Sequence, residues 1–134
     1  MPDETVHIND ADVAWEASYE GPVGPTVMIE RTFFSAGHTP TSGVSMGTFE
    51  VPPGAELPPH YHHPAEAYYV TEGEAEVYHD GDWHPLRRGD ALFFPSDAVH
   101  GVRNRGAERV AIVFVFPADS YDAIEYFYVP ESAG

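Results

Sequence analysis

The sequence contains no cysteine and no lysine among its 134 residues. The absence of cysteine excludes disulfide bonds, catalytic thiolates and zinc–thiolate sites. Only 6 residues are basic, all of them arginine, against 22 acidic residues, and the formal net charge is −16. A surface that binds nucleic acid or an anionic membrane needs clustered positive charge. We therefore expect no nucleic-acid partner and no membrane partner.

Long apolar segments are also missing. No stretch approaches the roughly 20 apolar residues that span a bilayer, and the acidic N-terminus lacks the apolar core of a secretory signal. These absences predict a cytoplasmic protein. The acidic, lysine-free composition fits a salt-loving host, because salt screens repulsion among carboxylates. It fits equally well an ordinary acidic protein that its charge keeps soluble.

Proline and glycine, 13 and 12 residues, divide the chain into short apolar runs. These runs are rich in the β-branched and aromatic residues that favour strands. Residues 118–126 have room for one helical turn, and no longer helical pattern is visible. We expect strands at Thr26–Phe34, Val44–Val51, Ala67–Thr71, Ala75–His79, Ala91–Phe94, Gly101–Arg103 and Val110–Phe116. Closely spaced strands predict an all-β sandwich or barrel, here a single domain over residues 26–130 that follows an N-terminal arm over residues 1–25.

Metal-ligand residue types gather at two places in the chain. His60, His62 and Glu66 share the parity that places side chains on one face of extended backbone. Tyr68 has the same parity and would face the same interior one pleat further on. His100 is the one ligand-type residue within a second island of strand-forming residues. Three imidazoles and one carboxylate form a mixed donor set that suits one divalent transition metal, such as Fe, Mn, Ni, Zn or Cu.

The spacing of these residues resembles the two motifs of the cupin superfamily. The first pattern, G-x5-H-x-H-x3-E-x6-G, and the second, G-x5-P-x-G-x2-H-x3-N, are separated by 15 residues. The one departure is Asp97, which stands where the second pattern has glycine in a turn. Asp tolerates left-handed backbone better than most residues, so we expect little effect on the site. The resemblance implies a double-stranded β-helix (jelly-roll) barrel with a bound metal. The matching positions are Gly54, His60, His62, Glu66 and Gly73, then Gly89, Pro95, His100 and Asn104.

The resemblance extends to the small single-domain cupin lyases that cleave dimethylsulfoniopropionate (DMSP), over about residues 42 to 127. The HYHHPAE core and the terminal EYF carry it. It implies that the four cupin ligands hold a divalent metal, and that tyrosines at positions 68 and 126 serve the chemistry. The alternatives for these two are a buried aromatic with a satisfied hydroxyl for Tyr68, and C-terminal packing for Tyr126. The resemblance also implies a homodimer.

DMSP cleavage is a β-elimination that releases dimethyl sulfide and leaves acrylate. A metal at the carboxylate would stabilise the developing charge, a tyrosine would act as the base, and aromatic side chains would hold the sulfonium by cation–π attraction. Two alternatives stay open: a cupin dioxygenase or isomerase acting on another small molecule, and a cupin that binds a metal or small molecule without turnover. Candidates for the aromatic wall are Phe49, Phe94, Phe114 and Phe116.

Overall fold

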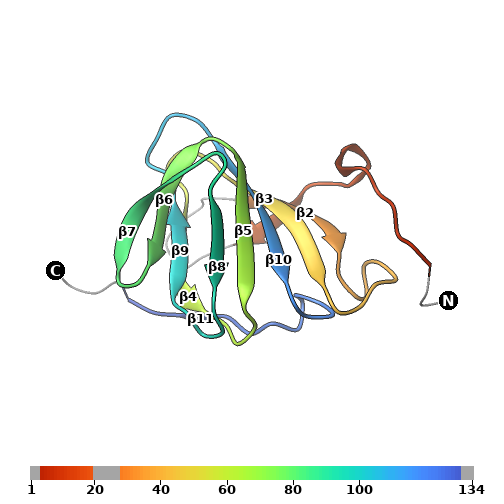
Figure 1. Cartoon of the computed structure of the whole chain (residues 1–134). Coiled ribbons are helices and arrows are strands. Elements are labelled where there is room, and N and C mark those ends of the chain that lie inside the picture. Colours follow the sequence, from red (N-terminus) through yellow and green to blue (C-terminus); the bar gives the residue numbers. More distant parts are fainter. Residues whose placement is uncertain (1–3, 20–27, 131–134) are drawn as a thin grey trace.

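The computed structural model describes residues 4–19 and 28–130, and two antiparallel sheets within them face each other and close into a barrel (Figure 1). One sheet has the order β1-β2-β3-β10-β5-β8, and the other has the order β11-β4-β9-β6-β7. The prediction of an all-β barrel is therefore confirmed. Within the described ranges no helix has the length and hydrophobicity to cross a membrane. The elements are η1 (Asp10–Asp12), β1 (Glu16–Tyr19), β2 (Met28–Phe34), β3 (Ser45–Val51), β4 (Glu56–Tyr61), β5 (Glu66–Glu72), β6 (Glu74–His79), β7 (Asp82–Arg87), β8 (Ala91–Phe94), β9 (His100–Arg103), β10 (Val110–Phe116) and β11 (Phe127–Tyr128).

Most predicted strands coincide with observed ones to within one or two residues. The strand predicted at Thr26–Phe34 begins outside the described residues, and its described part forms β2. Strand β7 was not predicted, because its sequence is polar and contains Pro85. It lies at the edge of its sheet, where a missing backbone donor is tolerated. Residues 118–126 are irregular apart from a turn at 121–124, in which Ile124 N donates to the Tyr121 carbonyl at 3.1 Å, so the helical turn considered above does not form.

Residues along β3 alternate between buried and half-buried, and the buried ones point into the barrel interior. Phe49 and Val51 are buried there, and they pair with the buried Ile112 and Val110 of the neighbouring strand β10. Gly47 pairs with Phe114 across the two strands, and a Cβ at Gly47 would collide with the Phe114 ring and with the Arg31 carbonyl. Glycine at this position therefore leaves room for an aromatic ring inside the barrel.

Asp97 has a φ of 65°, in the left-handed region, as expected for the residue that replaces the motif glycine. The turn that contains it ends just before β9, which His100 begins. Asn104 follows β9 and is fully buried. Its side chain donates to the carbonyls of Val51 and Glu108 at 2.9 and 2.7 Å and accepts from Gly106 N at 2.9 Å. The motif asparagine thus ties β9 to the end of β3 and to the loop before β10.

The described part of the N-terminal arm extends the six-stranded sheet. β1 pairs antiparallel with β2, and it brings Glu16 opposite Glu30. The Arg31 guanidinium lies 4.1 Å from the centre of the Trp15 ring, and its Nε donates to the Val13 carbonyl at 3.1 Å. This segment therefore packs on the barrel beside β2, as Figure 1 shows.

Candidate metal centre

His60, His62 and His100 converge inside the barrel, where each is at most 2% exposed. His60 and His100 are direct partners in the antiparallel pairing of β4 with β9, and their ring centres lie 4.4 Å apart. One ring nitrogen from each histidine lies within 4.8 Å of the other two. Three buried histidines from two regions of the sequence can therefore bind one metal ion.

Backbone carbonyls fix the tautomer of all three rings. Nδ1 of each histidine lies 2.8 or 2.9 Å from a carbonyl oxygen, which only accepts hydrogen bonds. Nδ1 therefore carries the proton, and the Nε2 lone pair is left for a ligand. Metal-bound histidines are oriented in the same way, through a hydrogen bond from the nitrogen that does not bind the ion. The accepting carbonyls belong to Pro58, Pro64 and Ala98.

Glu66 lies beside two of the three histidines. Its Oε1 atom lies 3.0 Å from Nε2 of His62 and 3.0 Å from Nε2 of His100. Two nitrogen lone pairs that face a carboxylate oxygen repel it unless a positive charge lies among them. Ligands bound at right angles around an ion, with bonds of about 2.1 Å, are about 3.0 Å apart. The separations of Glu66 from His62 and His100 are therefore those of neighbouring ligands around a divalent transition metal.

Two of the histidines have shifted pKa values. Burial, followed by the neighbouring His100, lowers the pKa of His60 to about 3, so this ring stays neutral. Burial also acts to lower the pKa of His62, but the hydrogen bond and negative charge of Glu66 outweigh it and raise that pKa. The raised pKa of His62 shows that Glu66 favours a positive charge beside it, which a metal ion would also supply.

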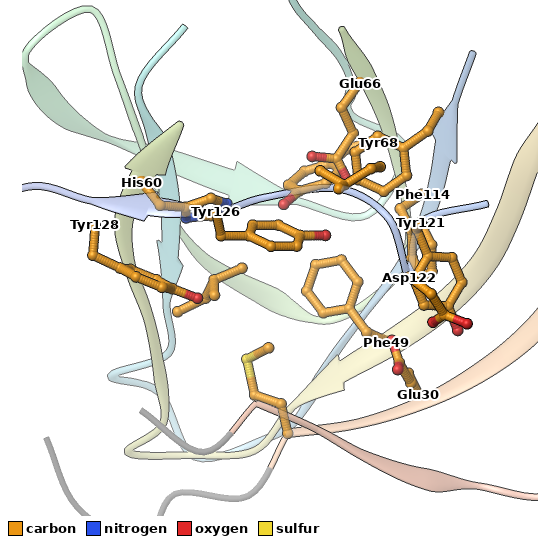
Figure 2. Close-up of a pocket in the computed structure, with 14 residues that line it drawn as sticks. Glu30, Phe49, His60, Glu66, Tyr68, Phe114, Tyr121, Asp122, Tyr126 and Tyr128 are labelled. Carbon is orange, nitrogen blue, oxygen red and sulfur yellow. The ribbon is translucent and has the colours of Figure 1, made fainter. Parts of the chain in front are cut away.

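A cavity of about 340 Å³ opens beside these residues (Figure 2). This volume lies at the lower end of the range of small-molecule sites, about 300–1,000 Å³. No arginine lines the cavity among the described residues, and half of its lining residues are phenylalanine or tyrosine. Its lining consists of Met28, Glu30, Phe49, Leu57, His60, Glu66, Tyr68, Phe114, Phe116, Tyr121, Asp122, Ile124, Tyr126 and Tyr128.

Both tyrosines singled out from the sequence line this cavity. The Tyr68 ring is 3% exposed and packs edge-on against Phe49 and Phe94. Tyr126 comes from the segment before β11, and its ring lies 5.3 Å from that of His62 and 5.6 Å from that of His60. Figure 2 shows its hydroxyl end pointing into the cavity. Burial, followed by the charge of Glu66, raises the pKa of both hydroxyls.

The structure adds lining residues that sequence reasoning missed: Glu30, Tyr121, Asp122 and Tyr128. Tyr128 shares the parity of Tyr126 and pairs with His60 across β11 and β4, so alternation along the EYFY run was an available signal. Tyr121 and Asp122 lie in the turn before β11, whose path the sequence does not fix. Of the four phenylalanines considered for the aromatic wall, Phe94 does not line this cavity and instead stacks on His100 at 4.2 Å.

Residues 47–116 match the family model described as a cupin domain. The chain belongs to the cupin family. The matched segment contains His60, His62, Glu66 and His100. The double-stranded β-helix barrel expected from the two motifs is thereby confirmed.

This cupin is 38% identical over 96 residues to the dimethylsulfoniopropionate lyase DddW of Ruegeria pomeroyi, an alignment that covers 72% of this chain and 62% of that protein. The alignments with two further curated relatives, both from Streptomyces species, cover 54% and 48% of the lengths of those proteins. The chain thus spans about half to three-fifths of the length of these relatives.

Solved structures of cupins share the architecture. The polyketide cyclase RemF from Streptomyces resistomycificus superposes with a TM-score of 0.79 at 22% identity, over 96% of this chain and 88% of that one. The DMSP lyase DddQ from Ruegeria pomeroyi superposes with a TM-score of 0.73 at 21% identity, over 92% of this chain and 64% of that one. At such identities the likeness shows the shared fold alone. The two structures are a cyclase and a lyase, so enzymes of different kinds have this fold.

Proposed function

We propose that this cupin is a metal-dependent lyase that cleaves DMSP, or a similar small carboxylate, to dimethyl sulfide and acrylate. The observation that carries the proposal is the cavity beside the histidines. It combines four tyrosines with further aromatic side chains, and no arginine lines it within the described chain. Such a cavity suits a substrate that carries a positive charge beside its reacting carbons. The 38% sequence identity with the lyase DddW supports the same function.

The ion would be held by His60, His62, His100 and Glu66. Backbone carbonyls fix the three imidazole rings, and the Glu66 carboxylate lies beside the free ring nitrogen of His100. When bound, the ion supplies a Lewis acid for the substrate carboxylate and for the negative charge that develops next to it. Phe116 packs edge-on against His62 with ring centres 5.2 Å apart, and Phe94 stacks on His100. These rings keep the imidazoles dry and restrict their rotation.

The elimination itself needs one base. A tyrosinate removes the proton next to the carboxylate, and the C–H electron pair forms the carbon–carbon double bond. The C–S bond then breaks with its electron pair on sulfur. The products are acrylate, neutral dimethyl sulfide and a protonated tyrosine, so charge and atoms balance.

Tyr126 and Tyr68 are the two candidate bases. Tyr126 reaches over the imidazoles, while Tyr68 lies two residues after Glu66 and is enclosed by other rings. The raised pKa of each hydroxyl makes its ionised form a stronger base. The sulfonium of the substrate supplies a positive charge in the same cavity, which lowers a tyrosine pKa on binding.

The test is product release by protein loaded separately with Mn, Fe, Ni or Zn. Sealed samples with and without oxygen receive DMSP, and dimethyl sulfide in the headspace and acrylate in solution are measured. The lyase releases both products in equal amounts without oxygen, and a chelator stops the release. Oxygen consumption without dimethyl sulfide would instead identify an oxygenase. Binding of DMSP with no product from any metal form would identify a binding protein.

A further inference from the structure

Strand β8 lies at an open edge of the six-stranded sheet. It pairs with β5 on one side, and no strand of the described chain pairs with its other side (Figure 1). Proteins usually protect such an edge with a charged residue, a proline or a very short strand. The other three edge strands have these features, because β1 contains Glu16, β7 contains Pro85 and β11 has two residues. The sequence of β8, ALFF, has neither a charge nor a proline.

The backbone groups of Ala91 and Phe93 point toward this open edge. Where β8 begins, Val70 N donates to the Asp90 carbonyl and the Val70 carbonyl accepts from Gly89 N, both at 2.9 Å. The Asp90 carbonyl is therefore directed at β5, and successive residues of a strand direct their backbone groups to alternate sides. Every second residue after Asp90 thus bonds to β5. Ala91 and Phe93 each present one N–H and one carbonyl to the other side.

Two large aromatic side chains lie exposed beside these backbone groups. Phe93 is 71% exposed and Tyr69 is 51% exposed. Tyr69 pairs with Ala91 across β5 and β8, and Phe93 lies two residues after Ala91, so the three side chains share the outer face of the sheet. Ala91 places only a methyl group between Tyr69 and the open edge. A further strand with an aromatic residue opposite Ala91 would therefore cover the Tyr69 ring.

A groove of about 670 Å³ adjoins β8, and all four residues of the strand line it. Asp80 is the only acidic residue among the described residues that line this groove, and no arginine is among them. The chain has a net charge of −16, so two copies repel each other wherever their acidic surfaces meet. At β8 and its groove two copies can approach with little of this local repulsion.

We infer that β8 pairs antiparallel with β8 of a second copy, about a two-fold axis at Leu92, so that the two six-stranded sheets join into one. In this register Ala91 of each copy lies opposite the partner's Phe93. Both N–H groups and both carbonyls of each edge then have partners, and the partner's Phe93 ring lies over Ala91 and reaches Tyr69. A two-fold axis uses one edge of each copy, so the assembly closes at two.

A second copy fits this edge better than an unrelated chain does. The strand offers no charge by which a different partner could be recognised, whereas a second copy matches it group for group. An aromatic side chain buries about 200 Å² when it is covered, so Phe93 and Tyr69 of two copies contribute roughly 500 Å². That is near a third of an interface of about 1,600 Å². The inference does not depend on the lyase activity proposed above.

The experiment measures the oligomeric state of the full chain, with metal supplied, by sedimentation at about 0.5 M NaCl, where charge repulsion is screened. The wild type should be a dimer. Phe93→Glu places a charge in the pairing and should weaken dimerisation by about tenfold or more. Ala91→Pro removes an N–H that points away from β5, so it should also weaken the dimer while β8 stays in its sheet. Val44→Glu is the matched control, because Val44 is 46% exposed and precedes β3, and its dimer should equal that of the wild type.

Hydrogen exchange supplies a second readout on the wild type alone. The amides of Ala91 and Phe93 should be protected in concentrated protein and should exchange rapidly after dilution to the monomer. Far-UV circular dichroism checks that each variant keeps its sheets.

A wild type that stays monomeric, or a dimer that survives both substitutions in β8, would overturn the inference. A dimer that Val44→Glu weakens as strongly as Phe93→Glu would also overturn it. Amides of Ala91 and Phe93 that stay protected in a monomer would show that another segment of the same chain covers the edge, which likewise excludes the pairing of two copies.

Discussion

Oε1 of Glu66 lies 3.0 Å from Nε2 of His100, although Glu66 begins β5 in one sheet and His100 begins β9 in the other. Neither residue is more than 5% exposed. The contact therefore joins the two sheets across the barrel interior through an imidazole and a carboxylate, which a proton or a shared cation would hold together. A bound ion would stabilise the fold as well as serve chemistry, because it binds only where both sheets are in place.

The first prediction concerns metal content. The wild type should bind about one divalent ion per chain, and the ion should raise the free energy of unfolding by about 2.7 kcal/mol when its free concentration is 100 times its Kd. His100→Ala should lose both the ion and the stabilisation. His63→Ala is the matched control, because His63 neighbours His62 in sequence but its side chain is 90% exposed. Elemental analysis and thermal melts measure both effects, and equal metal content in all three proteins would contradict the prediction.

The second prediction concerns the tyrosines. Tyr126→Phe or Tyr68→Phe should lower turnover of DMSP by about 10²–10⁴-fold for whichever residue is the base. Each substitution removes one oxygen and keeps the ring contacts, so metal content and DMSP affinity should change little. Acrylate release, elemental analysis and calorimetry give the three quantities. Wild-type rates in both variants would exclude a tyrosine base.

Sequence patterns predicted the barrel and the set of candidate ligands because both depend on local rules. Alternation puts His60 and His62 on one face, and the φ of 65° at Asp97 follows from its place in a turn. The cavity end formed by Glu30 and Asp122 depends on how β2 and the turn before β11 meet, which no local rule fixes. The homodimer, the cytoplasmic location and the division at residue 25 stay predictions.

The third prediction concerns acid stability without metal. The pKa of His60 is about 3 in the folded protein against 6.5 in the unfolded chain. Between these values the unfolded chain binds a proton that the folded protein does not, so the free energy of unfolding falls as the pH falls. This proton contributes a slope of up to about 1.4 kcal/mol per pH unit.

His60→Gln should make that slope shallower by up to the same amount, since the carboxylates titrate alike in both proteins. Urea unfolding in a chelator, at several pH values between about 3.5 and 6.5, measures the two slopes. Identical slopes for the variant and the wild type would show that His60 is not held neutral by burial.

The fourth prediction concerns salt. A net charge of −16 on a chain of 134 residues produces self-repulsion, which salt screens. The melting temperature should therefore rise as NaCl increases from low concentration to about 1 M. A melting temperature that stays flat or falls over this range would remove the argument for a salt-adapted protein.

The most direct measurement of the central claim is proton NMR of DMSP incubated under nitrogen with the metal-loaded protein. A metal-dependent lyase consumes the substrate with one acrylate formed for each dimethyl sulfide, and the reaction stops after a chelator removes the ion. DMSP that remains intact with Mn, Fe, Ni and Zn alike, or that disappears without forming acrylate, would show that this cupin is not a DMSP lyase.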